Sequence, residues 1–203
     1  MTARAMKDII LASTSATRLA MLEAAGLAVR VVAPEVDERP VKVKLAATRV
    51  RAETVASTLA ELKAVAVSKQ FPDAIVIGAD QMLDCDGRLF DKPVGRDGAK
   101  RQLRDLRGKR HRLISAVAVA VAGEVVWKHV ATASLSMRVF SDAFLDAYLE
   151  QAGDDVLGSV GAYRIEGLGA QLFAKLDGDH SVILGMPLLP LLDHLRLAGA
   201  IGS

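Results

Sequence analysis

The first half of the chain alternates short apolar runs with longer stretches of helical periodicity. The apolar runs are typical of strands and lie at 8–12, 29–33 and 74–79. The last run has no polar alternation, so we expect a strand that is buried on both faces and ends at Asp80. Apolar residues recur every three or four positions over 16–25 and 46–69, which predicts two helices. Pro34 ends the second run, and we expect 35–44 to form a loop.

The second half of the chain is predicted to form antiparallel sheet with further helices. Asp86-Gly87 separates two short apolar segments and readily takes the positive φ angles of a hairpin turn. The two arms of this hairpin lie at 82–85 and 88–90. Longer strands are expected at 113–121, 124–129 and 132–139. Three helices complete the pattern: one capped by Asp97, one starting at Ser141 and one starting at Pro187.

The whole pattern indicates one continuous α/β fold. No internal repeat, low-complexity tract or flexible linker divides the sequence. We therefore expect a single domain over residues 1–203, built as a mixed β-sheet with helices on its faces.

Composition and charge exclude several classes of protein. Among 203 residues, 26 Lys and Arg stand against 24 Asp and Glu, and 51% of residues are hydrophobic, which excludes a disordered or collagen-like chain. No apolar run reaches the ~18 residues of a membrane span, and Lys7 and Asp8 interrupt any signal-peptide core. The single cysteine, Cys85, fits a reducing compartment. We expect a cytoplasmic protein without a membrane partner.

Basic residues concentrate between Arg96 and Arg112. The same stretch carries Asp97 and Asp105 and has no interleaved aromatic residue. This pattern favours a solvated helix face over a nucleic-acid surface, and we expect no nucleic-acid partner.

The turn Ser13-Thr14-Ser15 lies between a predicted strand and a predicted helix, with Arg18 one turn further on. Free N–H groups and the positive end of a helix favour an anion, so this turn is a candidate phosphate cradle. The alternative is that Ser15 only caps the helix and that Arg18 lies on the surface.

Other polar residues could also carry chemistry. Asp80 follows an apolar strand, where ligands of open α/β sheets gather, and its carboxylate could bind a metal, deprotonate water or simply cap a turn. Lys92 could bring an ammonium group to a phosphate or lie in a solvated turn. Glu166 is the polar residue of a glycine-rich loop that approaches either a ligand or another strand. We expect His111 to be structural or solvated and Cys85 to be inert packing.

Taken together, these segments resemble the Maf family of nucleoside triphosphate pyrophosphatases over nearly the whole chain. The matching motifs occur in the family's order: LASTS at 11–15 with Arg18, APEVDE at 33–38, LAELKA at 59–64, IGADQ at 77–81, DKP at 91–93, Gly108 with His111, GAYRIEG at 161–167 and GMPL at 185–188. Eight ordered matches are far more specific than any one of them.

The resemblance implies an elongated fold related to inosine triphosphate pyrophosphatases, with two lobes around a central cleft and a possible homodimer. The cleft holds a nucleoside triphosphate and a divalent metal cation (Mg, Mn or Co), and the products are the monophosphate and pyrophosphate. Asp80 matches the general base or metal carboxylate, and Glu38 matches an acidic position near the metal. The phosphate-contacting positions are matched by Ser13, Arg18, Lys63 and Lys92. Lys63 is expected on the polar face of the helix at 46–69.

The substrate branch follows from two dipeptides. Asp80-Gln81 and Glu166-Gly167 resemble the branch of the family that prefers 7-methyl-GTP, whereas the dTTP and UTP branch has Asp-Thr and Gln-Gly. A Glu carboxylate accepts hydrogen bonds from guanine N1–H and its amino group, which uracil does not offer. Thr17 stands where the 7-methyl-GTP branch has Trp, which removes an aromatic face for the methylated base. Two alternatives stay open: a pyrophosphatase for dTTP, UTP or another non-standard nucleotide, and a nucleotide-binding regulator of septum formation without significant turnover.

Overall fold

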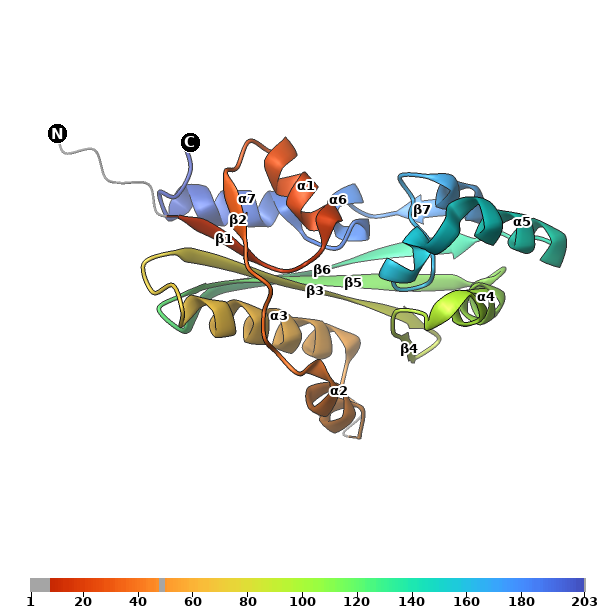
Figure 1. The fold of residues 1–203 in the computed structure, drawn as a ribbon, viewed down its shortest axis with the longest axis horizontal. Coiled ribbons are helices and arrows are strands. Elements are labelled where there is room, and N and C mark those ends of the chain that lie inside the picture. Colours follow the sequence, from red (N-terminus) through yellow and green to blue (C-terminus); the bar gives the residue numbers. More distant parts are fainter. Residues whose placement is uncertain (1–7, 48–49, 203) are drawn as a thin grey trace. The chain divides into compact units, whose positions relative to one another are not determined.

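The computed structural model describes residues 8–47 and 50–202 (Figure 1). Its residues form one seven-stranded sheet in the order β2-β1-β3-β5-β6-β7, with β4 paired to β3. The chain divides into two units, which are described separately. Unit 1 is drawn from Met1–Gln81, Ser115–Ala131 and Asp179–Ser203, and unit 2 from Met82–Ile114 and Thr132–Gly178.

Unit 1 is built on parallel pairing around β1 (Ile9–Ala12). This strand pairs with β2 (Val29–Val31) on one side and with β3 (Ile75–Cys85) on the other, where Ala12 lies opposite Gly78. Strands β5 (Arg110–Val121) and β6 (Glu124–Met137) each contribute residues to both units. Because β1 ends at Ala12, residues of β3 beyond Gly78 have no partner on that strand.

Helices cover both faces of the sheet in unit 1 (Figure 1). On one face, α1 (Ala16–Ala24) and α7 (Leu188–Leu197) pack their leucines against apolar residues of β1, β3 and β5. On the other face lies α3 (Ala52–Ser68), whose Val67 packs against Ile10 and Val76. Two further helices, α2 (Glu38–Ala47) and the short α6 (His180–Ile183), complete the unit.

Unit 2 contains the hairpin of β3 and β4 (Arg88–Phe90), in which Asp86 and Gly87 both have positive φ. Its helices are α4 (Gly95–Leu106) and α5 (Asp142–Ala152), followed by the 3₁₀ helices η1 (Gly153–Gly158) and η2 (Leu168–Leu172). Strand β7 (Phe173–Asp177) pairs antiparallel with the end of β6.

The predicted fold class is confirmed: parallel and antiparallel strands share one sheet flanked by helices. The hairpin at Asp86-Gly87 and the start of a helix at Ser141 are also confirmed, since the Oγ of Ser141 accepts a hydrogen bond from Phe144 N at 3.1 Å. None of the helices in the described residues is long and apolar enough to cross a bilayer.

Two predictions between 35 and 69 are wrong. The segment 35–44 is largely helical because α2 begins at Glu38, and Pro40 lies in its first turn, where the missing N–H has no intrahelical partner to lose. The single helix predicted over 46–69 is divided, since α2 ends at Ala47 and α3 begins at Ala52. Residues 48–49 of that prediction, like residues 1–7 of the signal-peptide argument, lie outside the described part of the chain.

Other boundaries are wrong for local reasons. Strand β3 does not end at Asp80 but continues to Cys85, because no Gly or Pro lies between these two residues and Lys63 pairs with the Asp80 carboxylate. The strands predicted at 124–129 and 132–139 are one strand, β6. Asp97 is not the cap of α4, which starts two residues earlier, and instead lies in its first turn, where a negative charge suits the helix dipole.

Candidate functional site

Residues 13–15 link the end of β1 to the start of α1. Ser15 is the N-cap of α1, and its Oγ accepts a hydrogen bond from Arg18 N at 3.3 Å. Ser13 is buried, and its Oγ accepts hydrogen bonds from Ser15 N at 3.2 Å and Arg18 Nη1 at 3.4 Å. Thr17 is partly exposed in the first turn. Ser15 therefore caps the helix, as one of the two alternatives predicted, and the positive end of the helix lies beside the hydroxyl of Ser13.

Arg18 links the start of α1 to β3 and to the segment that follows α6. Its Nη1 donates to the carbonyl of Ala79 at 2.9 Å, and its Nε donates to the carbonyl of Gly185 at 3.0 Å. Burial lowers the pKa of the Arg18 guanidinium, while the nearby charges of Asp80 and Glu38 act to raise it. Arginine stays protonated in proteins, so a fixed positive charge lies next to both carboxylates.

Lys63 joins those two carboxylates. Its Nζ lies 2.6 Å from Asp80 Oδ1 and 2.7 Å from Glu38 Oε1, and only 11% of its side chain is exposed. Partial burial opposes ionisation of Glu38, but the hydrogen bond and charge of Lys63, together with Lys42, outweigh it and hold the pKa of Glu38 below its usual value. The expectation that Lys63 lies on a polar helix face is wrong, because the ion pairs allow the residue to be buried.

A glycine brings α3 this close to β3. A Cβ atom on Gly78 would lie 2.3 Å from the carbonyl oxygen of Ala60 and 2.6 Å from Ala64 N, so the backbone of α3 packs directly against β3. Lys63 follows from the same turn of α3, and Asp80 lies two residues after Gly78 on β3. The absence of a side chain at Gly78 thus sets the position of the Lys63–Asp80 pair.

Asp80 has one carboxylate oxygen without a partner. Its Oδ2 is buried and accepts no hydrogen bond within the described residues. Buried polar atoms are normally paired, so such an atom points to a ligand. Mg²⁺ is usually bound by one or two carboxylates together with substrate phosphates and water.

The residues of unit 1 fit a cation of this kind. No group of three or more His, Cys, Asp or Glu able to hold a metal occurs among the described residues. Asp80 and Glu38 therefore suit a divalent cation whose remaining ligands come from phosphate and water, rather than a cation held by protein atoms alone.

Gln81 anchors the segment that leads to α7. Its Nε2 donates to Ser115 Oγ at 3.0 Å and to the carbonyls of Val182 and Ile183 at 3.1 and 3.0 Å. Ser115, which is buried, donates from its hydroxyl to the Val182 carbonyl at 2.7 Å. The amide nitrogen of this predicted substrate-contacting residue is thus engaged in holding α6 against β3 and β5.

Lys92 and Glu166 belong to unit 2. Lys92 is exposed on the loop after β4. Glu166 is exposed on the loop 161–167, and its Oε1 accepts hydrogen bonds from Arg164 Nε and Nη2, both at 3.3 Å. A hydrogen bond from α5 holds this loop, since Tyr148 donates from its hydroxyl to the carbonyl of Ala162 at 3.2 Å.

His111 supports the same loop. Only 1% of its surface is exposed, and its Nε2 lies 2.8 Å from the hydroxyl of Tyr163. Burial lowers the pKa of His111 to about 4 and raises the pKa of Tyr163 well above its usual value. The burial of His111 agrees with the expectation that it is structural. Cys85 is also buried, and burial, followed by the charge of Asp86, raises the pKa of its thiol, which agrees with the expectation that it is inert.

His111 should make stability depend on pH. An unfolded histidine has a pKa of about 6.5, while the folded value is about 4, so between these values the unfolded chain binds the extra proton. Stability contributed by the neutral imidazole is complete above pH 6.5 and is lost as pH falls, by roughly 3 kcal/mol on reaching pH 4. Urea unfolding from pH 8 to pH 4 measures this loss. His111→Gln should show a correspondingly shallower decline, and equal slopes for the two proteins would contradict the assignment.

Sequence reasoning missed one neighbour of the site. Lys42 Nζ lies 3.3 Å from Glu38 Oε2, as an i, i+4 pair on α2. The spacing of Glu38 and Lys42 is itself the signal for such a pair, but it has meaning only on a helix, and this segment was predicted to be a loop.

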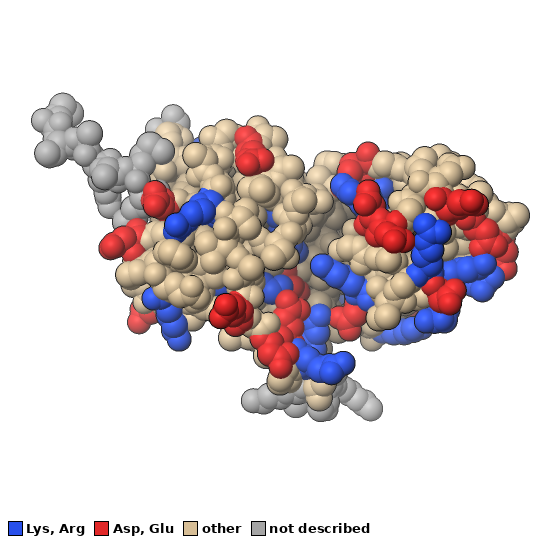
Figure 2. Space-filling model, in the orientation of Figure 1, with Lys and Arg blue, Asp and Glu red and all other residues tan. Residues whose placement is uncertain are grey.

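Basic residues between Arg96 and Arg112 form ion pairs with acidic residues of unit 2. Acidic and basic side chains are interspersed over the region of α4 and α5 (Figure 2). Arg104 and Arg107 both contact Asp142, at 2.9 and 2.8 Å, and Arg96 contacts Asp154 at 3.1 Å.

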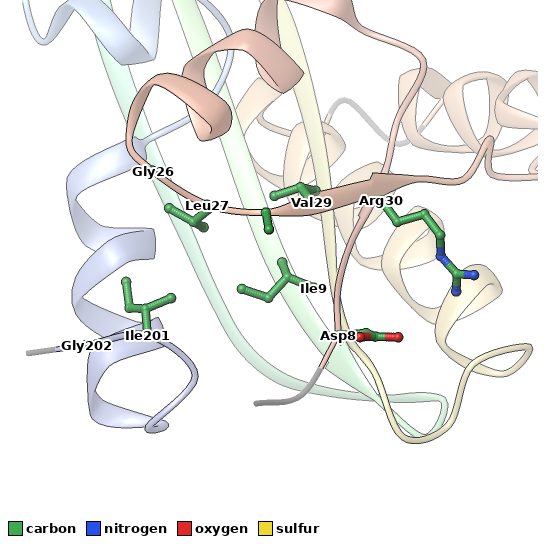
Figure 3. A pocket seen from close by; sticks show the side chains of 9 residues that line it. Asp8, Ile9, Gly26, Leu27, Val29, Arg30, Ile201 and Gly202 are labelled. Atoms are coloured by element: carbon green, nitrogen blue, oxygen red, sulfur yellow. The ribbon is translucent and has the colours of Figure 1, made fainter. Parts of the chain in front are cut away.

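A hollow of about 550 Å³ lies at the other end of β1 from the serine turn (Figure 3). It is lined by the chain around Asp8, by the turn Gly26–Leu27 and by Ile201 and Gly202. None of the predicted site residues lines this hollow, which therefore is not where the carboxylates and Lys63 meet.

Three comparisons with known proteins show what the chain is similar to. A family model described as Maf-like protein matches residues 8–198. A protein of Paramagnetospirillum magneticum named nucleoside triphosphate pyrophosphatase is 55% identical over 94% of this chain and 98% of its own length. A protein of Mesorhizobium japonicum named 7-methyl-GTP pyrophosphatase is 47% identical over 96% of this chain and 98% of its own. A solved dITP/XTP pyrophosphatase from Mycobacterium abscessus superposes loosely, with 17% identity, a TM-score of 0.37 and coverage of 96% of this chain and 98% of its own.

Proposed function

The chain belongs to the Maf family of nucleoside triphosphate pyrophosphatases, and we propose that its preferred substrate is a modified purine nucleotide, 7-methyl-GTP. The products are the nucleoside monophosphate and pyrophosphate. The dipeptides Asp80-Gln81 and Glu166-Gly167 support this choice, as do the relatives that bear that substrate's name.

The observation that carries the reaction is the buried, unpartnered Oδ2 of Asp80, next to the cationic side chains of Lys63 and Arg18. A divalent cation held at Asp80 and Glu38 would screen the negative charge of the triphosphate. Either role of Asp80, metal ligand or general base, needs a carboxylate oxygen that no protein donor occupies. Within the described residues, no donor reaches Asp80 Oδ2.

Asp80 acts on water through Oδ2. It orients the water molecule and accepts its proton as the water oxygen bonds to phosphorus and the anhydride link between the α and β phosphates breaks. Lys63 and Arg18 supply positive charge that offsets the charge developing on the phosphate oxygens, and the hydroxyl of Ser13 donates to the same chain of phosphates. Lys92 is assigned a phosphate contact from its motif alone.

Recognition of the base is assigned to Glu166. Its carboxylate accepts two hydrogen bonds, from N1–H and the exocyclic amino group of guanine. Thr17, in place of an aromatic residue, leaves the methyl group without a stacking partner from α1. Selection therefore depends mainly on the guanine edge, and we expect GTP to be the nearest competitor of 7-methyl-GTP.

The test is pyrophosphate release from 7-methyl-GTP, GTP, ITP, UTP and dTTP, each with Mg²⁺, Mn²⁺ or Co²⁺. We expect 7-methyl-GTP to have the highest kcat/KM. Glu166→Gln should lower kcat/KM for both guanine nucleotides by about 10- to 100-fold, the value of a hydrogen bond to a charged group, and should leave UTP unchanged. Glu150→Gln, on the exposed face of α5, is the matched control and should change none of these values.

The outcomes separate the alternatives. Highest turnover with dTTP or UTP would overturn the assignment of 7-methyl-GTP and leave the reaction intact. Tight nucleotide binding without pyrophosphate release, at saturating concentrations of each metal, would instead identify a nucleotide-binding regulator and contradict the enzymatic function.

A further inference from the structure

Lys63 occupies the position between two carboxylates that a shared cation would take. Its ammonium group lies within 2.7 Å of one oxygen of Glu38 and within 2.6 Å of one oxygen of Asp80. These carboxylates come from different elements, α2 and β3, and Lys63 comes from a third, α3. The two carboxylates are therefore bridged by a positive charge that the protein itself provides.

A divalent cation held by these two carboxylates, even one bound through the unpartnered Asp80 Oδ2, would lie close to the Lys63 ammonium, so like charges would be brought together. Two unit charges a few ångströms apart repel strongly in a partly buried site, where water screens them poorly. At the same time, the described residues offer no third acidic or His ligand that could strengthen the protein's hold on the cation. The carboxylates alone are thus poorly prepared to bind a metal while Lys63 remains between them.

A triphosphate removes this obstacle. Its oxygens accept hydrogen bonds from an ammonium group as well as carboxylate oxygens do, and they also coordinate divalent cations. When Lys63 pairs with the triphosphate instead, it no longer occupies Glu38 Oε1 and Asp80 Oδ1. The same triphosphate supplies additional oxygen ligands for the metal.

From this geometry we propose that Lys63 is an internal competitor of the divalent metal, and that its transfer from the carboxylates to the triphosphate couples nucleotide binding to metal binding. The inference rests on the proposed function, because it takes the ligand to be a nucleoside triphosphate with a metal. By linkage, each ligand increases the affinity for the other by the same factor. The metal is consequently held more tightly when a polyphosphate is present.

The chain offers a matched control in Lys42. This lysine also pairs with Glu38, but through Oε2 at 3.3 Å, and 30% of its side chain is exposed. Removal of Lys42 deletes a positive charge near Glu38 without opening the oxygens that face Lys63. A competitor role therefore predicts different effects for the two lysines, whereas a general change in local charge predicts similar ones.

The experiment is titration of the nucleotide-free protein with Mn²⁺, with free Mn²⁺ measured by its paramagnetic resonance signal. Lys63→Met should bind Mn²⁺ at least about tenfold more tightly than the unmodified protein, since the competing charge is gone. Lys63→Arg, which keeps the charge, and Lys42→Met should stay within about threefold of the unmodified protein. Unchanged or weaker Mn²⁺ binding by Lys63→Met would overturn the proposal.

A second measurement uses the unmodified protein, so it does not depend on whether a variant folds. In the unmodified protein with ¹³C-labelled lysine, saturation with diamagnetic Mg²⁺ should move the Lys63 Cε resonance, and a non-hydrolysable GTP analogue added with Mg²⁺ should move it further. A resonance that stays fixed while Mg²⁺ is bound would contradict the proposal. Neither readout needs turnover. If the unmodified protein releases pyrophosphate but Lys63→Met has unchanged Mn²⁺ affinity, only this inference is rejected. If the unmodified protein releases no pyrophosphate with any metal, the proposed function is rejected.

Discussion

Pyrophosphate release is expected to fall by roughly 10³-fold when Asp80 is replaced by asparagine. Asparagine has nearly the same shape, and its carbonyl oxygen can still accept the hydrogen bond that Lys63 Nζ donates to Asp80 Oδ1 at 2.6 Å. The change falls on Oδ2, the buried atom without a partner in the described residues, which becomes an NH₂ group. That group neither accepts a proton from water nor binds a cation, so kcat should fall far more than the affinity for nucleotide.

The measurement is kcat and KM for pyrophosphate release by Asp80→Asn, together with the affinity for a non-hydrolysable analogue. Asp84→Asn provides a closely matched control. Asp84 lies on the same strand, is buried to 8% exposure compared with 6% for Asp80, and also pairs with a cation, Arg112. Its oxygens are already satisfied, by Gly87 N at 2.9 Å and by Arg112. We expect Asp84→Asn to lose stability but to keep kcat within about threefold, and equal losses in the two variants would argue against a catalytic role for Oδ2.

Gly78→Ala is expected to be the most destabilising single-methyl addition in unit 1. The added Cβ would lie 2.3 Å from the Ala60 carbonyl oxygen and 2.9 Å from the Ala64 Cβ, so the backbone of α3 would have to move away from β3. Overpacking of a well-packed core costs about 1–3 kcal/mol and occasionally more, and a clash with helix backbone belongs at or above the upper end, at least about 3 kcal/mol. Since α3 carries Lys63, activity should fall even where the variant remains folded.

Chemical denaturation with a parallel activity assay checks this expectation. The control is Gly158→Ala: a Cβ at exposed Gly158 meets no atom within 4 Å, and this glycine has no positive φ to strain. That variant should be within about 0.5 kcal/mol of the original protein. If Gly78→Ala is as stable as Gly158→Ala, close packing of α3 on β3 does not limit the fold.

The fold could be predicted where a local signal has a single structural meaning. The positive-φ pair Asp86-Gly87 and the capping serine Ser141 are such signals, and both predictions are confirmed. The predicted ends of strands and helices are wrong where tertiary contacts determine them. Asp80 looks like the end of a strand because a carboxylate interrupts an apolar run, but β3 continues since Lys63 pairs with that carboxylate.

In the candidate site, too, the sequence identified residues but not the contacts between them. Local chemistry indicated Ser13, Arg18 and Asp80, and the family motifs added Glu38 and Lys63. In the structure these residues of unit 1 lie together around the two carboxylates. Periodicity placed Lys63 on a polar face, because no pattern along one helix reveals which charged partners come from α2 and β3. The unpartnered Oδ2 of Asp80 is a property of three-dimensional packing, and no sequence pattern could have indicated it.

The solitary, shielded thiol of Cys85 makes this protein convenient for spectroscopy. Maleimide dyes and nitroxide spin labels react with thiolates at accessible positions, and Cys85 is only 4% exposed, with its pKa raised by burial. A cysteine introduced at Val94 or Leu197, each 88% exposed, would therefore carry nearly all of the label without prior removal of the natural cysteine. Fluorescent and paramagnetic reporters can thus be attached to the otherwise unaltered chain, one chosen position at a time.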